Sequence, residues 1–336
     1  MRRRRRSRGR AAALLGGAAG LAYLGASYLA SRRFARALLS PTALGPIAQD
    51  RERFLSSLRG AAGRAETFTH EGDPRDPARL VCTFATPGDP ASRPTVLFLH
   101  GKGGNAAEWQ VDALRALAMG ANVLAPDLRG HGESGGRLVT YGLLESTDLS
   151  RGVSAAAGRF GIDPGCLGVH GCSAGATVAL AFASGNPAVR ALWLESPYSD
   201  PRTMARHYLR RMTGLPPALL AVAAHFAFRR AGAALAARLG RPRGARVPLP
   251  DPLAAARKLE CPVMLVYGRR DELVPPAFVS RLLEALPSSS EAWQVEGAGH
   301  CHHADEAQAV CPELYSRRWI LFFRRNLFPT IPSSSS

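Results

Sequence analysis

A serine between two glycines marks the stretch of this sequence best suited to chemistry. Residues 171–175, Gly-Cys-Ser-Ala-Gly, read G-x-S-x-G. The short apolar run 166–170 before them predicts a buried strand, and the alanine-rich run 176–183 after them predicts a helix. A sharp turn from strand to helix would hold the Ser173 hydroxyl clear of the backbone, because Gly171 and Gly175 allow close approach. Such a serine can attack a carbonyl carbon once a base takes its proton.

Residues that could supply the base and the acid lie downstream. The predicted strand 292–295 is followed by three candidate bases, His300, His302 and His303. The predicted strand 261–268 is followed by Asp271, whose carboxylate could accept a hydrogen bond from a histidine ring. The predicted strand 191–194 is followed by two alternative acids, Glu195 and Asp200.

The elements that would position these side chains alternate between strand and helix from about residue 66. Strands are predicted at 79–85, 95–99, 122–125, 166–170, 191–194, 261–268 and 292–295. This alternation predicts an α/β fold with a mostly parallel, doubly wound sheet. Polar and glycine-rich residues gather at the carboxyl ends of the strands, which is the edge where open α/β sheets bind ligands.

Five motifs, in this order, resemble those of the α/β-hydrolase family. They are H-G-x-G-G at 100–104, P-D-x-R-G-H-G-x-S at 126–134, G-x-S-x-G at 171–175, Y-G-x-x-D-x-x-V-P at 267–275 and G-x-G-H at 297–300. Residues 66–325 are therefore similar to an α/β-hydrolase. Within that family they most resemble membrane-anchored lipases and esterases and serine aminopeptidase-like members.

The resemblance implies a role for each motif residue. It makes Ser173 the nucleophile, His300 the base and Asp271 the acid that orients the base. It assigns the two backbone N–H groups of the oxyanion hole to Lys102 and Ala174, and makes Gly101, Gly171 and Gly175 motif glycines. The Lys102 side chain either reaches solvent or contacts an anionic substrate. The family pattern gives structural roles to the carboxylate and imidazole of the second motif, Asp127 and His131.

These roles predict a serine hydrolase that acts through an acyl-enzyme, most simply on a small-molecule or lipid carboxylic ester. A serine peptidase of the aminopeptidase-like branch is one alternative, and a non-catalytic scaffold with the same fold is another. No cofactor is implied. The sequence does not define the oligomeric state.

Basic residues are distributed unevenly along the 336-residue chain, which has a formal charge of +17. Residues 1–49 contain ten arginines and no acidic residue, so the remainder carries +7. Ten further arginines lie between residues 197 and 250, where a hydrolase inserts a helical cap, and only Asp200 opposes them there. Without interleaved aromatic residues, this pattern argues against nucleic-acid binding. The basic, apolar cap predicts either a lid lying against anionic lipid or an ordinary solvated face.

The six cysteines form no CxxC pair, which favours small buried residues over a disulfide framework or a zinc site. A disulfide between Cys301 and Cys311 is possible in an oxidising compartment. A metal site is not predicted, because the only candidate ligand set lacks a partner cluster. That set consists of Cys301, His302, His303 and Asp305.

The N-terminal residues predict attachment to a membrane. A basic leader, 1–10, precedes twenty uncharged residues, 11–30, which are long enough to cross a bilayer. We expect an uncleaved signal-anchor with its N-terminus in the cytoplasm and the catalytic domain on the outer side. Secretion after cleavage and a disordered leader on a soluble protein are the alternatives.

The sequence thus predicts five segments. They are a basic leader at 1–10, a transmembrane anchor at 11–30, a linker and lead-in helix at 31–65, a hydrolase domain at 66–325 with a cap at about 197–250, and a tail at 326–336.

Overall fold

The computed structural model describes residues 2–41, 47–214, 217–301 and 307–328, without the side chains of 2–16, 19, 47–49, 212, 217–219 and 307–308. The chain divides into two compact units. One unit, called here the arginine-rich unit, consists of Met1–Leu39 and Arg202–Pro248. The other, called the hydrolase unit, consists of Ser40–Pro201 and Leu249–Ser336.

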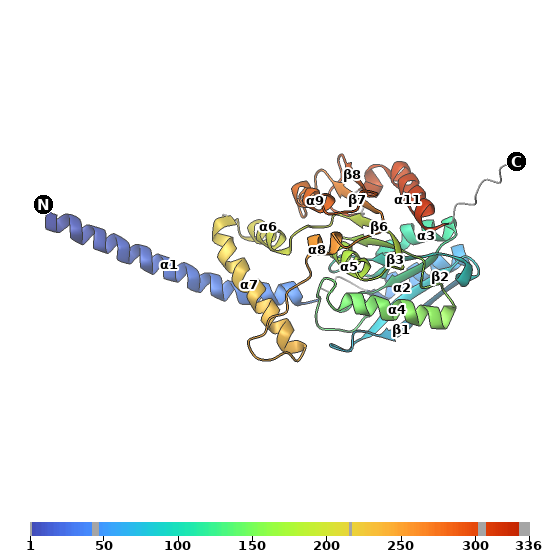
Figure 1. Ribbon diagram of the computed structural model, residues 1–336, viewed down its shortest axis with the longest axis horizontal. Helices are drawn as coiled ribbons and strands as arrows, with labels where there is room; N and C mark the ends of the chain where they lie inside the picture. The colour runs from blue at the N-terminus through green and yellow to red at the C-terminus, as the bar shows by residue number, and fades with distance from the viewer. Residues whose placement is uncertain (1, 42–46, 215–216, 302–306, 329–336) are drawn as a thin grey trace. The chain divides into compact units, whose positions relative to one another are not determined.

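The hydrolase unit is built on an eight-stranded sheet (Figure 1). Its strands are β1 (Arg64–Glu71), β2 (Arg79–Thr86), β3 (Thr95–Leu99), β4 (Asn122–Pro126), β5 (Leu167–Cys172), β6 (Val189–Glu195), β7 (Val263–Gly268) and β8 (Glu291–Val295). Their order in the sheet is β1-β2-β4-β3-β5-β6-β7-β8. The β2 strand pairs antiparallel with β1 and with β4, and every other pair is parallel. The predicted α/β-hydrolase fold is confirmed.

Continuous apolar sequence makes the central strands, because helices cover both faces of a parallel sheet. Every residue of β3, β4 and β5 is buried. In one group of helices, α3 (Gln110–Met119) packs against both α2 (Ile47–Ala62) and α11 (Pro312–Leu327). A second group contains α4 (Glu145–Phe160), α5 (Ala174–Ala183) and α8 (Pro252–Ala256). The short helices α9 (Pro276–Leu283) and α10 (Ala307–Val310) complete the unit.

The hydrolase unit begins before residue 66, where the sequence places its start. The predicted linker contains α2, whose Phe54 and Leu58 are fully buried in the core. The Arg51 side chain of the same helix pairs with Asp127 and donates to Thr83 Oγ1 at 3.1 Å. Apolar burial and a buried ion pair therefore hold this segment in the fold. At the other end, α11 extends to Leu327, and residues 329–336 of the predicted tail lie outside the described residues.

The arginine-rich unit contains α1 (Arg2–Leu39), α6 (Pro201–Thr213) and α7 (Pro217–Arg238). A single helix, α1, runs through the predicted leader, the predicted anchor and the start of the predicted linker. Along α1 the buried residues recur every fourth position, at Ser27, Ser31, Ala35 and Leu39. That spacing puts them on one face of the helix, and this face packs against α7.

Among the residues that the structure describes, no helix combines the length and the apolar character needed to cross a bilayer. The side chains of residues 11–16 and 19, within the predicted anchor, lie outside that description. The transmembrane anchor and its topology therefore stay predictions.

Candidate active site

Ser173 occupies the turn between β5 and α5 in a backbone conformation that non-glycine residues rarely adopt. Its φ is 52° and its ψ is −115°. Strain of this kind costs on the order of 1–3 kcal/mol and persists only where the surroundings enforce it. Here the Ser173 N–H donates to the Glu195 carbonyl at 2.8 Å, which ties the turn to the end of β6. The turn therefore has the geometry of a nucleophile elbow.

The two motif glycines allow this elbow to form. A Cβ atom on Gly171 would lie 2.7 Å from the Gly175 carbonyl oxygen, closer than real side chains approach. A Cβ atom on Gly175 would overlap the carbonyl oxygens of Leu99 and His100. The start of α5 thus packs directly against the ends of β5 and β3, and a side chain at Gly171 or Gly175 would prevent one of these contacts.

Asp271 and His300, from the loops after β7 and β8, meet in a hydrogen bond. His300 Nδ1 lies 2.8 Å from Asp271 Oδ2. The other carboxylate oxygen, Oδ1, accepts from the backbone N–H groups of Leu273 at 3.0 Å and Val274 at 2.7 Å. The Asp271 side chain is fully buried, whereas that of His300 is 19% exposed. A fixed carboxylate therefore holds a ring that solvent can reach.

The loop carrying His300 is fastened next to the elbow. The residue after His300 is Cys301, whose φ is 65° and whose N–H donates to Ser196 Oγ at 3.1 Å. Burial, together with a hydrogen-bond contact from the neighbouring Cys172 thiol, raises the pKa of Cys301 well above its usual range. Because Cys172 precedes Ser173, this contact joins the chain neighbours of the proposed nucleophile and the proposed base.

The H-G-x-G-G loop also lies against the elbow. A Cβ atom on Gly101 would be 3.6 Å from Ser173 Cβ, so the peptide leading to Lys102 borders the serine. Ala174 is the first residue of α5, where backbone N–H groups are free to bind an anion. The Lys102 side chain is half-buried, and burial lowers the pKa of its ammonium group.

His100 links the H-G-x-G-G loop to the second motif. Its Nε2 accepts from the Leu128 N–H at 2.9 Å, so Nδ1 carries the proton donated to the Gly101 carbonyl at 2.7 Å. Burial lowers the pKa of His100 to about 3. The ring thus stays neutral and holds both loops in place.

The second motif has the structural role that the family pattern implies. His131 Nδ1 lies 3.0 Å from the Arg129 carbonyl, and its ring packs 5.1 Å from that of His100. Asp127 accepts from the N–H groups of Ala106 at 2.9 Å and Glu133 at 2.8 Å. These contacts shape the loops beside the elbow.

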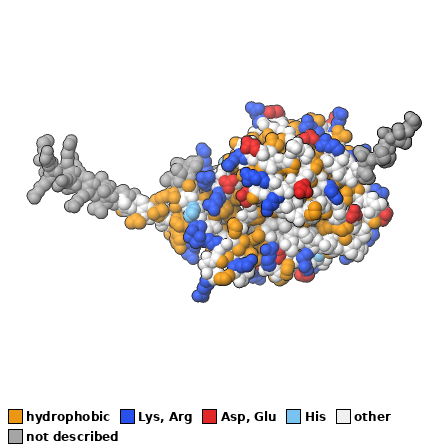
Figure 2. All heavy atoms as spheres, in the orientation of Figure 1, with side chains coloured by type: hydrophobic (Ala, Val, Ile, Leu, Met, Phe, Trp, Pro, Cys, Tyr) orange, Lys and Arg blue, Asp and Glu red, His pale blue; other side chains and the backbone are white. Residues whose placement is uncertain are grey.

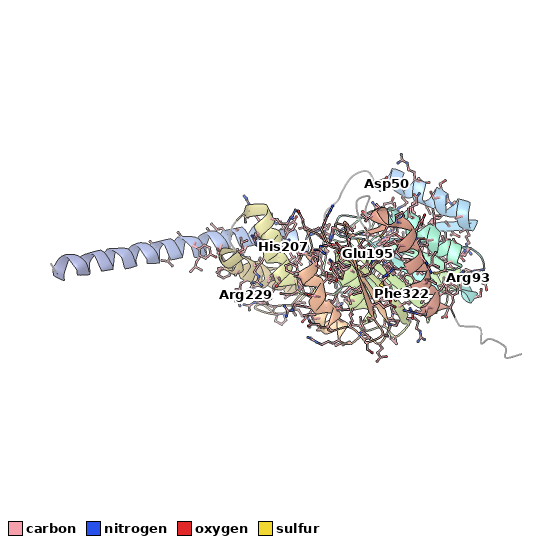
Figure 3. The ribbon with its side chains drawn as sticks, turned by 90° about the horizontal axis from the view of Figure 1, so that it is seen from above. Asp50, Arg93, Glu195, His207, Arg229 and Phe322 are labelled. Carbon is pink, nitrogen blue, oxygen red and sulfur yellow. The ribbon has the colours of Figure 1, made fainter. Side chains whose placement is uncertain are left out.

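Glu195, an alternative acid, is buried inside the hydrolase unit, where Figure 3 labels it, and it is part of a hydrogen-bonded cluster. Its Oε1 lies 3.0 Å from His170 Nε2, accepts from Trp193 Nε1 at 3.1 Å and accepts from the Tyr315 hydroxyl. Trp319 Nε1 donates to His170 Nδ1 at 3.2 Å, which leaves the His170 proton on Nε2. Sequence reasoning missed this cluster, whose one signal was a histidine inside an apolar strand. Asp271 is the acid hydrogen-bonded to His300, and the alternative bases His302 and His303 lie outside the described residues.

The cysteines are free thiols, including Cys301 and Cys311, which the sequence left as a possible pair. Within the described part of the chain, no three histidine, cysteine or acidic side chains are grouped to hold a metal ion. His302, His303 and Asp305 of the candidate ligand set fall outside it.

A half-buried glutamate next to the H-G-x-G-G loop, Glu108, makes stability depend on pH. The Glu108 carboxylate occupies the space that a Cβ on Gly104 would need, and burial raises its pKa from 4.5 to about 7. The folded state therefore binds this proton more tightly than the unfolded state, so the ionised group destabilises the fold increasingly as pH rises from 4.5 to 7. We expect Glu108→Gln to stabilise the protein by about 2 kcal/mol more at pH 8 than at pH 5. Thermal unfolding at both pH values measures this difference, and an equal effect at the two would contradict it.

The sheet, the elbow and the Asp271–His300 pair define a hydrolase of the α/β class. A profile described as the alpha/beta hydrolase family matches residues 96–313, more than half of the chain. The chain belongs to this family.

The chain is also similar to individual proteins. The uncharacterized protein YqkD of Bacillus subtilis is 28% identical over 208 residues, which cover 61% of this chain and 64% of that protein. The chain thus spans a little under two thirds of this curated relative. Esterase Pf2001 of Pyrococcus furiosus is 24% identical with a TM-score of 0.62, covering 86% of this chain and 99% of that one. A puromycin-hydrolyzing peptidase of Mycobacterium tuberculosis is 22% identical with a TM-score of 0.57, covering 80% and 40%. Both structures share the fold.

Proposed function

We propose that this hydrolase cleaves carboxylic esters through a covalent acyl-serine. The observation that carries the proposal is the 2.8 Å hydrogen bond between Asp271 and His300, in a loop fastened beside the strained turn of Ser173. An acid that fixes one ring nitrogen leaves the other, Nε2, as the base.

The reaction begins when Ser173 Oγ bonds to the ester carbonyl carbon and His300 Nε2 takes the hydroxyl proton. The carbonyl oxygen becomes negative and accepts hydrogen bonds from the Lys102 and Ala174 N–H groups. The bond to the alcohol then breaks, and His300 gives its proton to the leaving oxygen. Water attacks the acyl-serine in the second half, with His300 again as the base, and releases the acid. Asp271 stabilises the imidazolium in both halves.

A fluorophosphonate probe tests the identity of the nucleophile. We expect covalent labelling of the wild-type protein at Ser173, no labelling of Ser173→Ala, and normal labelling of the control Ser184→Ala. Ser184 is a suitable control because it ends the same helix and its hydroxyl donates to the Ala181 carbonyl at 3.0 Å. An unlabelled wild type would instead support a non-catalytic scaffold, and a labelled Ser173→Ala would place the nucleophile elsewhere.

Peptide hydrolysis is the second candidate, favoured by the shared fold with the puromycin-hydrolyzing peptidase. The same acyl-serine forms from an amide, but the leaving amine needs protonation by His300 more than an alcohol does. Ester and amide substrates with one common acyl group, assayed side by side, distinguish the two. A kcat/KM for the amide equal to or above that for the ester would favour the peptidase.

A further inference from the structure

The two units differ sharply in charge, because every acidic residue of the chain lies in the hydrolase unit. The arginine-rich unit contains twenty arginines and no lysine, aspartate or glutamate, a formal charge of +20. The remaining residues hold 23 basic and 26 acidic side chains, a charge of −3, which accounts for the chain's +17. A unit with no internal acidic partner needs its counter-charge from elsewhere.

The same unit exposes large apolar side chains on α1. Leu21 is 72% exposed, Leu24 is 45% exposed and Leu29 is 62% exposed. Immediately after them the exposed surface of the helix changes to arginine, at Arg32, Arg33 and Arg36. Figure 2 shows orange apolar and blue basic side chains next to each other on this unit. Apolar surface followed within one turn by cations is the pattern of helices that enter the interface of a membrane.

Leu21, Leu24 and Leu29 are not part of the contact with α7, because the two helices pack through other residues. The face of α1 that contacts α7 consists mainly of small residues, with Ser27, Ser31 and Ala35 buried. The buried face of α7 contains Ala224, Ala227 and Ala231. The Phe226 ring meets the Tyr28 ring edge-on at 5.6 Å. Small residues on both faces let the two helices approach closely, so the large side chains of α1 lie outside the contact.

An arginine of α7 joins the two helices where the apolar surface ends. The Arg230 guanidinium lies 4.0 Å from the centre of the Tyr28 ring and donates to Ser31 Oγ at 2.9 Å. Tyr28 itself is 49% exposed. A tyrosine between leucines and arginines matches the order of side chains across a lipid interface, where aromatic rings sit at the headgroup level.

We propose that the arginine-rich unit binds the surface of bilayers that contain anionic lipids. Leu21, Leu24 and Leu29 insert between acyl chains, and the arginines that follow them bind headgroup phosphates. The proposal does not depend on the hydrolase activity.

Flotation of the full chain with vesicles tests this. We expect binding to vesicles with 30% phosphatidylglycerol, weak binding to pure phosphatidylcholine, and release as NaCl rises from 0.1 to 0.5 M. The triple variant Arg32→Gln, Arg33→Gln, Arg36→Gln should bind about 100-fold more weakly, since each arginine near an anionic surface contributes about fivefold. Leu21→Asp with Leu24→Asp should also abolish binding. The control pair Leu314→Asp and Leu321→Asp changes leucines of α11 that are 45% and 57% exposed, and should leave binding intact.

Three results would overturn the proposal. Equal, salt-resistant binding to neutral and anionic vesicles would indicate an embedded span. Binding to duplex DNA as tight as to vesicles, and unchanged in the leucine variant, would indicate a nucleic-acid surface. Equal losses in the α11 control would indicate non-specific adsorption.

Hydrolysis of a soluble short-chain ester and the far-ultraviolet circular dichroism spectrum show whether a variant is folded. If the variant with Leu21→Asp and Leu24→Asp is not folded, the variant with Leu21→Ala and Leu24→Ala replaces it. Its expected loss of vesicle binding is smaller, and the same results would contradict the proposal.

Discussion

Asp271→Asn is expected to lower kcat for ester hydrolysis about 10⁴-fold with little change in KM. The reason lies in the two backbone N–H groups of Leu273 and Val274, which bind Oδ1. An asparagine keeps its carbonyl oxygen there and turns its NH₂ group toward His300. The ring must then accept at Nδ1 and carry its proton on Nε2, which can no longer take the proton of Ser173. Steady-state kinetics on a soluble ester measure the loss.

The control for this variant is Glu195→Gln. Glu195 is also a buried carboxylate hydrogen-bonded to a histidine, but its partner is His170 and not His300. We expect a lower melting temperature with kcat close to that of the wild type. Comparable losses of kcat in both variants would mean that burial of a carboxylate, and not the orientation of His300, explains the first result.

Gly175→Ala is expected to destabilise the hydrolase unit by about 3 kcal/mol or more. The added methyl group would overlap the carbonyl oxygens of Leu99 and His100, and both are backbone atoms at the end of a fully buried strand. Neither can rotate away as a side chain does, so α5 and β3 must separate. Thermal unfolding should show a fall of about 6–12 °C.

Gly185→Ala provides the matched comparison. Gly185 follows the other end of α5, and a Cβ atom there would meet nothing within 4 Å. Its melting temperature should stay near that of the wild type. If Gly175→Ala melts within about 2 °C of the wild type, the close approach between α5 and β3 does not constrain the fold.

Local sequence was sufficient for the central sheet and for the positions of the candidate site residues. The strands before Ser173 and Asp271 are short, mainly apolar runs followed by polar residues, so their type and their ends are visible in the chain. The edge strand β1 was missed because only some of its residues are buried, and a mixed polar run gives no clear period.

Long-range contacts were beyond that reasoning. The pairing of Arg51 with Asp127 joins residues 76 positions apart, and the link from Arg230 to Ser31 spans 199 positions. Nothing in the sequence near either arginine indicates its partner. For the same reason the sequence analysis treated the N-terminal segment and the cap as separate parts. The contact between α1 and α7 depends on small residues, which are common throughout both helices and do not indicate a partner.

The packing of α1 on α7 has a consequence for producing this enzyme. Removing an N-terminal helix is the usual way to obtain a manageable protein from one with an apolar leader. Here a cut after Leu39 would take away the partner of α7 and uncover the alanine face that contains Ala224, Ala227 and Ala231. The shortened protein would expose a new apolar surface and would be more prone to aggregate. A shortened version avoids this new surface only if both segments of the arginine-rich unit are removed together.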